Sequence, residues 1–109
     1  MGMRVQLQEQ SGGKTIHHAS IVLDGAASGM VTTAELANAL EELRKSPAIP
    51  SREQRRADTA LDRALQWTRT RPPAGVSGRF SKCFCFDPQH PGSSFRFDIE
   101  GITGVHLKV

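Results

Sequence analysis

The chain is poor in the residues that build disulfide frameworks. It contains two cysteines, one tryptophan and no tyrosine. Cys83 and Cys85 are too few and too close together for such a framework, which favours a reducing compartment. The start of the chain, residues 1–5, lacks the apolar stretch of a secretory signal. We therefore expect a cytoplasmic protein.

Long apolar runs are also missing from the sequence. No stretch approaches the ~20 apolar residues that a membrane helix needs, so we expect no membrane partner. The 109 residues suffice for one hydrophobic core, and a hydrophobic content of 38% is typical of an ordinary folded domain. We predict a single small domain over residues 1–109.

Motifs that mark catalysis or cofactor binding are absent as well. The sequence has no Gly-x-Ser-x-Gly nucleophile elbow and no glycine-rich phosphate loop. His17 and His18 lie near Asp24, but neighbouring residues on a strand point to opposite faces, so the two imidazoles cannot act as one acid-base pair. We therefore predict that the protein is not an enzyme and has no cofactor.

The clearest pattern in the chain is a first helix that starts at Thr32. Thr32 and Glu35 have the spacing of a capping box, in which each residue satisfies a free backbone N–H of the other. Leu36, Leu40 and Leu43 then recur at helical spacing and form one apolar stripe. The connection 46–50 contains two prolines and ends this helix.

A second helix is predicted to begin with Ser51 as its N-cap and to end before Pro72 and Pro73. Its small residues would allow close approach to the first helix. The predicted inner face consists of Ala57, Ala60, Leu61, Ala64, Leu65 and Thr68.

Alternating patterns before the helices predict a hairpin of two strands. Met3, Val5 and Leu7 form the apolar set of the first strand, and the second strand has its own set at residues 19, 21 and 23. A tight turn at residues 12–13 would place these two sets on opposite faces. We therefore expect one extra residue in the loop, which brings both sets to one face.

Alternating patterns after the helices predict three more strands. Pairing Phe84 with Phe97 and Phe86 with Phe95 places four rings on one face, ready to pack on the helices. A last strand, 105–109, would extend the sheet to five strands. The predicted fold is α+β, a two-helix hairpin packed on one face of a mostly antiparallel sheet in the order ββ-αα-βββ. The expected core is Leu36, Leu40, Leu43, Leu61, Leu65, Phe84, Phe86, Phe95 and Phe97.

Two segments carry partial metal-binding patterns. Residues 24–35 match several positions of a calcium-binding EF-hand loop, but Ala26 supplies no oxygen at the third position and Ser28 only a hydroxyl at the fifth. Cys83, Cys85 and His90 are ligand types that zinc accepts, whereas structural zinc sites use four ligands at wider spacing. We interpret the first segment as a turn and the cysteines as two half-buried thiols, and predict no metal.

Positive charge is concentrated in residues 51–73, whose net charge of +3 equals that of the whole chain. At 100° per residue the arginines form a stripe with an aromatic ring one turn beyond Arg63. Glu53 partly offsets Arg56, and Asp58 partly offsets Arg55. Arginine beside an aromatic ring can hold phosphate and stack on a base. The candidate nucleic-acid-binding residues are Arg52, Arg56, Arg63, Trp67 and Arg71.

Three functions remain open at this point. The first is a small regulatory protein that binds nucleic acid, or an acidic protein surface, through the basic helix face. The second is a protein-binding inhibitor or adaptor, such as a phage-type or plasmid-type accessory protein, with an exposed strand edge that would also permit a homodimer. The third is a small RNase-like enzyme, because the layout is similar to that of small bacterial toxins that cleave messenger RNA.

Overall fold

The computed structural model describes residues 2–25, 29–70, 78–89, 94–102 and 105–108. Its element order confirms the predicted α+β class and the order of strands and helices. The elements are β1 (Met3–Ser11), β2 (Lys14–Leu23), β3 (Met30–Thr32), α1 (Thr33–Arg44), the 3₁₀ turn η2 (Ser51–Glu53), α2 (Gln54–Thr70), β4 (Phe80–Cys85), β5 (Phe95–Gly101) and β6 (His106–Lys108).

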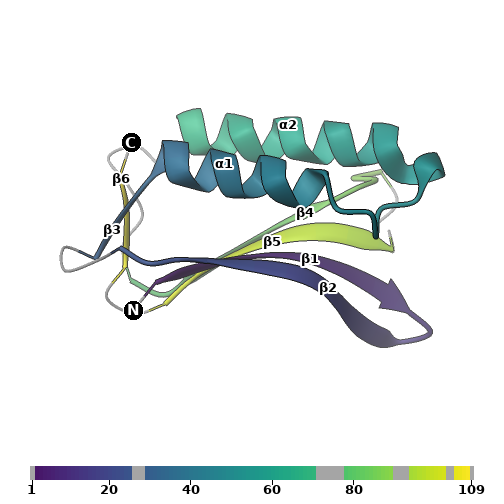
Figure 1. Ribbon diagram of the computed structural model, residues 1–109, viewed down its shortest axis with the longest axis horizontal. Helices are drawn as coiled ribbons and strands as arrows, with labels where there is room; N and C mark the ends of the chain where they lie inside the picture. Colours follow the sequence, from purple (N-terminus) through teal and green to yellow (C-terminus); the bar gives the residue numbers. More distant parts are fainter. Residues whose placement is uncertain (1, 26–28, 71–77, 90–93, 103–104, 109) are drawn as a thin grey trace.

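The two helices lie side by side over one face of a four-stranded antiparallel sheet, as Figure 1 shows. The strand order is β2-β1-β5-β4, so strands from the two ends of the chain form the centre of the sheet. α1 packs over β1 and β2, whereas α2 packs over β4 and β5. Among the described elements no helix covers the other face (Figure 1). Neither described helix combines the length and the apolarity needed to cross a bilayer.

α1 begins where the capping residues predict. The Thr32 hydroxyl accepts a hydrogen bond of 3.2 Å from the backbone N–H of Glu35, which satisfies one of the free donors of the first turn. Leu36, Leu40 and Leu43 are buried, because all three point from one side of the helix toward the sheet.

α2 begins two residues later than an N-cap at Ser51 predicts, and the prediction of Ser51 as its N-cap is wrong. Residues 51–53 form a 3₁₀ turn that follows Pro50, and no side chain caps that turn. The N–H of Glu53 bonds instead to the Pro50 carbonyl at 2.9 Å, the tighter pattern that often opens a helix. The stop predicted at Pro72 and Pro73 lies outside the described residues.

The inner face of α2 is made of small side chains. Ala57, Ala60, Ala64 and Thr68 are buried, and the predicted core residues Leu61 and Leu65 are only partly buried. The alanine row allows α2 to approach the sheet closely, so the longer leucines sit beside the contact rather than within it. All the other predicted core residues are buried.

The first hairpin has the predicted register but reaches it by a different route. Residues 12 and 13 form a two-residue turn with φ of +57° and +79°, a conformation that glycine adopts without strain. The extra residue lies within β2, because Leu7 faces Ala19 while Gln8 faces His17. His18 is therefore a β-bulge, and the expectation of an extra residue in the loop is wrong.

The aromatic core forms as the sequence predicts. Phe84 faces Phe97 across the ladder of β4 and β5. Phe86 continues the pairing beyond β4, since its N–H bonds to the Phe95 carbonyl at 3.0 Å and the two rings stack with centroids 5.5 Å apart. The Phe86 and Phe97 centroids are 5.0 Å apart. These rings fill the space beneath the helices.

The last strand does not extend the main sheet, so the prediction of a five-stranded sheet is wrong. β6 pairs in parallel with β3 in a separate two-stranded sheet, with Leu107 opposite Val31. Both of these side chains are buried. β3 leads directly into α1, and this small sheet closes the end of the core from which α1 starts (Figure 1).

Candidate nucleic-acid interface

A groove of about 480 Å³ runs between α2 and the edge strand β4. Six of its lining residues come from the helix and two from the strand. They are Thr59, Asp62, Arg63, Gln66, Trp67, Thr70, Lys82 and Phe84.

The helix contributes a cation and an aromatic ring to this groove. Arg63 and Trp67 are four residues apart, so they lie one turn apart on the flank of α2 that faces β4. Trp67 is half-buried, with ring centroids 6.5 Å from Phe80 and 6.1 Å from Phe84. Its indole is thereby held in place while part of its surface remains open to the groove.

The strand contributes a second cation. Because side chains alternate along β4, Lys82 and Phe84 point toward the helix while Cys83 and Cys85 point to the uncovered face. The Lys82 Nζ and the Arg63 Cζ each lie 5.8 Å from the centroid of the Phe84 ring. Two exposed cations therefore lie next to one aromatic ring that is only 4% exposed.

Arg63 is anchored to the strand it faces. Its Nη1 donates a hydrogen bond of 3.0 Å to the Cys85 carbonyl. A guanidinium has five N–H donors, so most of them remain available to a ligand. Asp62 also lines the groove, and its carboxylate repels an anion at that end. The groove thus carries two positive charges and one negative charge on its described lining.

The position of Phe80, the ring that supports Trp67, depends on a glycine. Gly101 lies opposite Phe80 in the β4–β5 ladder. A Cβ at this position would lie 2.2 Å from the Phe80 ring, closer than any real contact. Glycine therefore allows the ring to lie flat on the sheet beneath Trp67.

The structure brings only two of the predicted site residues together. Arg63 and Trp67 share the groove, whereas Arg56 lies further toward the start of α2 and forms an ion pair of 3.5 Å with Glu53. Arg52 is exposed in η2, and it has no ion pair within the described part of the chain. Arg71 lies outside the described residues.

One predicted ion pair is replaced by another. Asp58 pairs with Arg44 of α1, which also donates to the Gln54 carbonyl at 3.1 Å. Arg55 is exposed and, among the described residues, has no ion-pair partner. The expectation that Asp58 offsets Arg55 is therefore wrong, because a helix wheel of α2 does not include the neighbouring helix.

The residues that sequence reasoning missed are those of β4. Lys82 and Phe84 have the same strand parity as the aromatic core, so the alternation of β4 already placed them on the helix side. The alternation could not show which helix lies over β4. The structure shows that it is α2 rather than α1.

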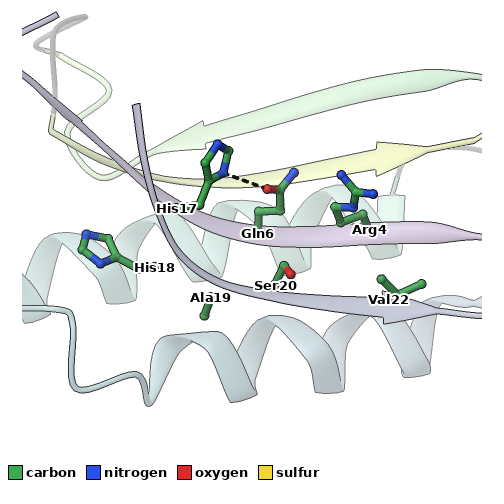
Figure 2. A pocket seen from close by; sticks show the side chains of 7 residues that line it. All are labelled: Arg4, Gln6, His17, His18, Ala19, Ser20 and Val22. Carbon is green, nitrogen blue, oxygen red and sulfur yellow. Dashed lines mark hydrogen bonds between the residues drawn. The ribbon is translucent and has the colours of Figure 1, made fainter. Parts of the chain in front are cut away.

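The adjacent histidines lie on β2, at the opposite edge of the sheet from β4, where both line a hollow of about 580 Å³ (Figure 2). His17 Nδ1 donates to Gln6 Oε1 at 3.1 Å. His18 Nε2 donates to Glu9 Oε1 at 2.8 Å and its ring stacks on Phe95. The two rings point away from one another and form no pair, as the strand geometry predicts.

The described parts of the two partial metal motifs do not gather into a larger ligand set. Residues 26–28 and His90 lie outside the described residues, and the end of the EF-hand-like segment is taken up by β3 and α1. Within the described ranges no group of three or more His, Cys, Asp or Glu side chains is placed to hold an ion.

Comparison with known proteins adds no relative. No protein-family model, curated protein or solved structure matches the chain.

Proposed function

We propose that this protein is a small, non-catalytic nucleic-acid-binding regulator, and that a single strand lies in the groove between α2 and β4. One observation carries the proposal: Arg63 and Lys82 flank the same aromatic floor, and the partly open ring of Trp67 lies beside them. Cations that flank an aromatic platform are the usual elements of a single-strand binding groove.

In this arrangement each group has a separate task. The guanidinium of Arg63 and the ammonium of Lys82 hold successive phosphates, and the open side of the Trp67 indole stacks on a base. The exposed Arg52, Arg55 and Arg69 extend the positive field along the outer side of η2 and α2. Asp62 weakens the field at one end and helps to fix where the phosphates lie.

The small number of phosphate contacts limits the expected affinity. Single-strand binding loses about 0.7 decades of affinity per decade of salt for each phosphate contact. With two groove contacts the salt slope is about 1.4, so we expect weak binding that falls about fivefold between about 50 and 150 mM salt. Such a protein would act at high local concentration or together with a partner. The reducing, cytoplasmic location included in this proposal rests on the small number of cysteines, which cannot form a disulfide framework.

The direct test is fluorescence anisotropy of a labelled single-stranded oligonucleotide at low salt. Arg63→Gln and Lys82→Gln together should weaken binding about tenfold and reduce the salt slope by about 1.4. Arg4→Gln is the control for Arg63→Gln alone, because Arg4 is exposed on the uncovered face and each substitution removes one arginine charge. Equal weakening by the control, or no binding of the wild type, would refute the proposed interface.

A protein-binding inhibitor or adaptor is the second candidate, and one observation favours it. β2 is an edge strand with an unpaired side, and Val22 on it is 63% exposed. Such an edge can accept a strand from a partner or from a second copy of this chain, although the bulge at His18 interrupts it. Sedimentation analysis with Val22→Lys tests the homodimer. A dimer that the substitution dissociates would support it, and a concentration-independent monomer would remove it.

A further inference from the structure

Cys83 and Cys85 form a pair of thiols outside the groove. They alternate with Phe84 on β4 and point to the face of the sheet that no described helix covers. Both thiols are free, and their Sγ atoms are 4.0 Å apart. Cys83 is exposed and Cys85 half-buried, so a solute can reach the pair.

The spacing of the two sulfur atoms is wrong for a disulfide in this strand. A disulfide needs Sγ atoms about 2.05 Å apart, so the pair would have to close by roughly half its separation. The backbone resists this closure, because Cys83 and Cys85 are paired in the ladder with Asp98 and Arg96 of β5. Arg63 also holds the Cys85 carbonyl from the other side.

The same spacing suits a single ion held between the sulfur atoms. With metal–sulfur bonds of about 2.3 Å, two sulfur atoms on opposite sides of one ion lie about 4.6 Å apart, which small rotations of the two side chains can reach from the observed 4.0 Å. The strand therefore holds both donors near bonding distance from one point. No change of the ladder is needed to bring them there.

The number of donors selects the kind of ion. Structural zinc takes four ligands, and no set of three or more side chains surrounds an ion site in the described part of the chain. Thiolates favour copper(I), zinc and iron–sulfur clusters, and of these copper(I) is the one that two sulfur ligands satisfy. We propose that Cys83 and Cys85 chelate one copper(I) ion on the uncovered face. The prediction of no metal from the sequence was made for calcium and zinc only. The copper(I) site does not depend on nucleic-acid binding.

Proton release accompanies this binding. Each coordinating thiol loses its proton to solvent, and copper(I) with two thiolates forms a complex of net charge −1 without any change of oxidation state. On the same face Arg96 forms an ion pair of 3.2 Å with Asp98, which neutralises the carboxylate beside Cys83.

The test is an anaerobic titration in which the reduced protein competes with a coloured chelator for copper(I). The wild type should take up one ion per chain. Cys83→Ser and Cys85→Ser should each weaken binding about a hundredfold or more, because losing one sulfur removes the chelate effect. Circular dichroism of the serine variants checks that the fold is intact.

The alternative outcomes are distinct. Single serine variants that bind like the wild type would overturn the chelate, as would a wild type that binds no more tightly than the double serine variant. One ion per two chains would show a bridge between copies and would equally contradict the proposal. Titration with zinc alone should give much weaker binding than copper(I).

Discussion

The two flanks of α2 are built differently. Toward α1 the flank is closed, because Asp58 pairs with Arg44 and the partly buried Leu61 and Leu65 fill the contact. Toward β4 the flank is open, and it presents Arg63 and Trp67 to a groove. The same helix therefore contributes to stability on one side and offers a ligand surface on the other. The charge of a helix does not reveal which flank is which.

The largest expected effect is a loss of stability when a cavity is made in the core beneath α1, on the closed side of α2. Leu40 is fully buried between α1 and the sheet. Leu40→Ala should lower the free energy of unfolding by about 2–5 kcal/mol, because the substitution leaves a cavity. Urea unfolding monitored by circular dichroism measures this loss. Unchanged stability would contradict the packing of α1 on the sheet.

A smaller effect is expected from displacing Phe80, the ring that supports Trp67 on the open side. Gly101→Ala forces the Phe80 ring away from the sheet and should lower stability by about 1–3 kcal/mol through overpacking. The emission of Trp67 should shift in the same variant, since Phe80 supports the indole. Adding Phe80→Leu makes room for the new methyl group, so the double variant should recover part of the loss. Additive losses in the double variant would show that the two positions do not touch.

Substitution of two carboxylates on α2 tests the difference between its two flanks directly. Asp58→Asn removes the ion pair with Arg44 and should lower stability by up to about 1 kcal/mol, because the Asp58 side chain is largely exposed. It should leave oligonucleotide affinity nearly unchanged. Asp62→Asn should do the opposite, raising affinity severalfold with little effect on stability, because its carboxylate lies in the groove. Thermal unfolding measures the stability of both variants, and anisotropy titrations measure their oligonucleotide affinity. If the two variants change equally in both quantities, the two flanks do not differ as described.

The smallest expected effect is a pH dependence at Cys83. Its folded-state pKa, raised by burial to about 12 from the ordinary value of 9.0, lies above that of the unfolded chain. The folded state therefore holds its proton more tightly, and this contribution to stability is complete below pH 9.0 and is lost as the pH rises toward 12. Cys83→Ser should flatten the fall in stability over that range. Parallel curves for the two proteins would contradict the shift.

The sequence predicted the layers and the aromatic pairing, because both follow from side-chain periodicity. The Thr32 cap, the leucine stripe of α1 and the pairing of Phe84 with Phe97 each depend on local spacing. The location of the bulge was not predictable in this way. The structure keeps both the tight turn at residues 12–13 and the apolar register. The one-residue mismatch between them is accommodated by the bulge at His18.

Only half of the candidate site, the part on α2, could be predicted from the sequence. The helix wheel found Arg63 and Trp67, but Lys82 enters the groove from a strand that the wheel does not contain. The pairing of β6 with β3 was missed for a similar reason, because a parallel contact between distant segments leaves no local pattern. Contacts between elements decide which exposed charges gather, and a single sequence does not show those contacts.

The most direct test of the groove uses Trp67, the single tryptophan of the chain. A single-stranded oligonucleotide added at low salt should quench its emission as a base stacks on the indole. The quenching should disappear at high salt and in the Arg63→Gln, Lys82→Gln double variant, and it should persist in Arg4→Gln. Oligonucleotide binding that leaves the emission of Trp67 unchanged would place the interface elsewhere on the protein and contradict the account.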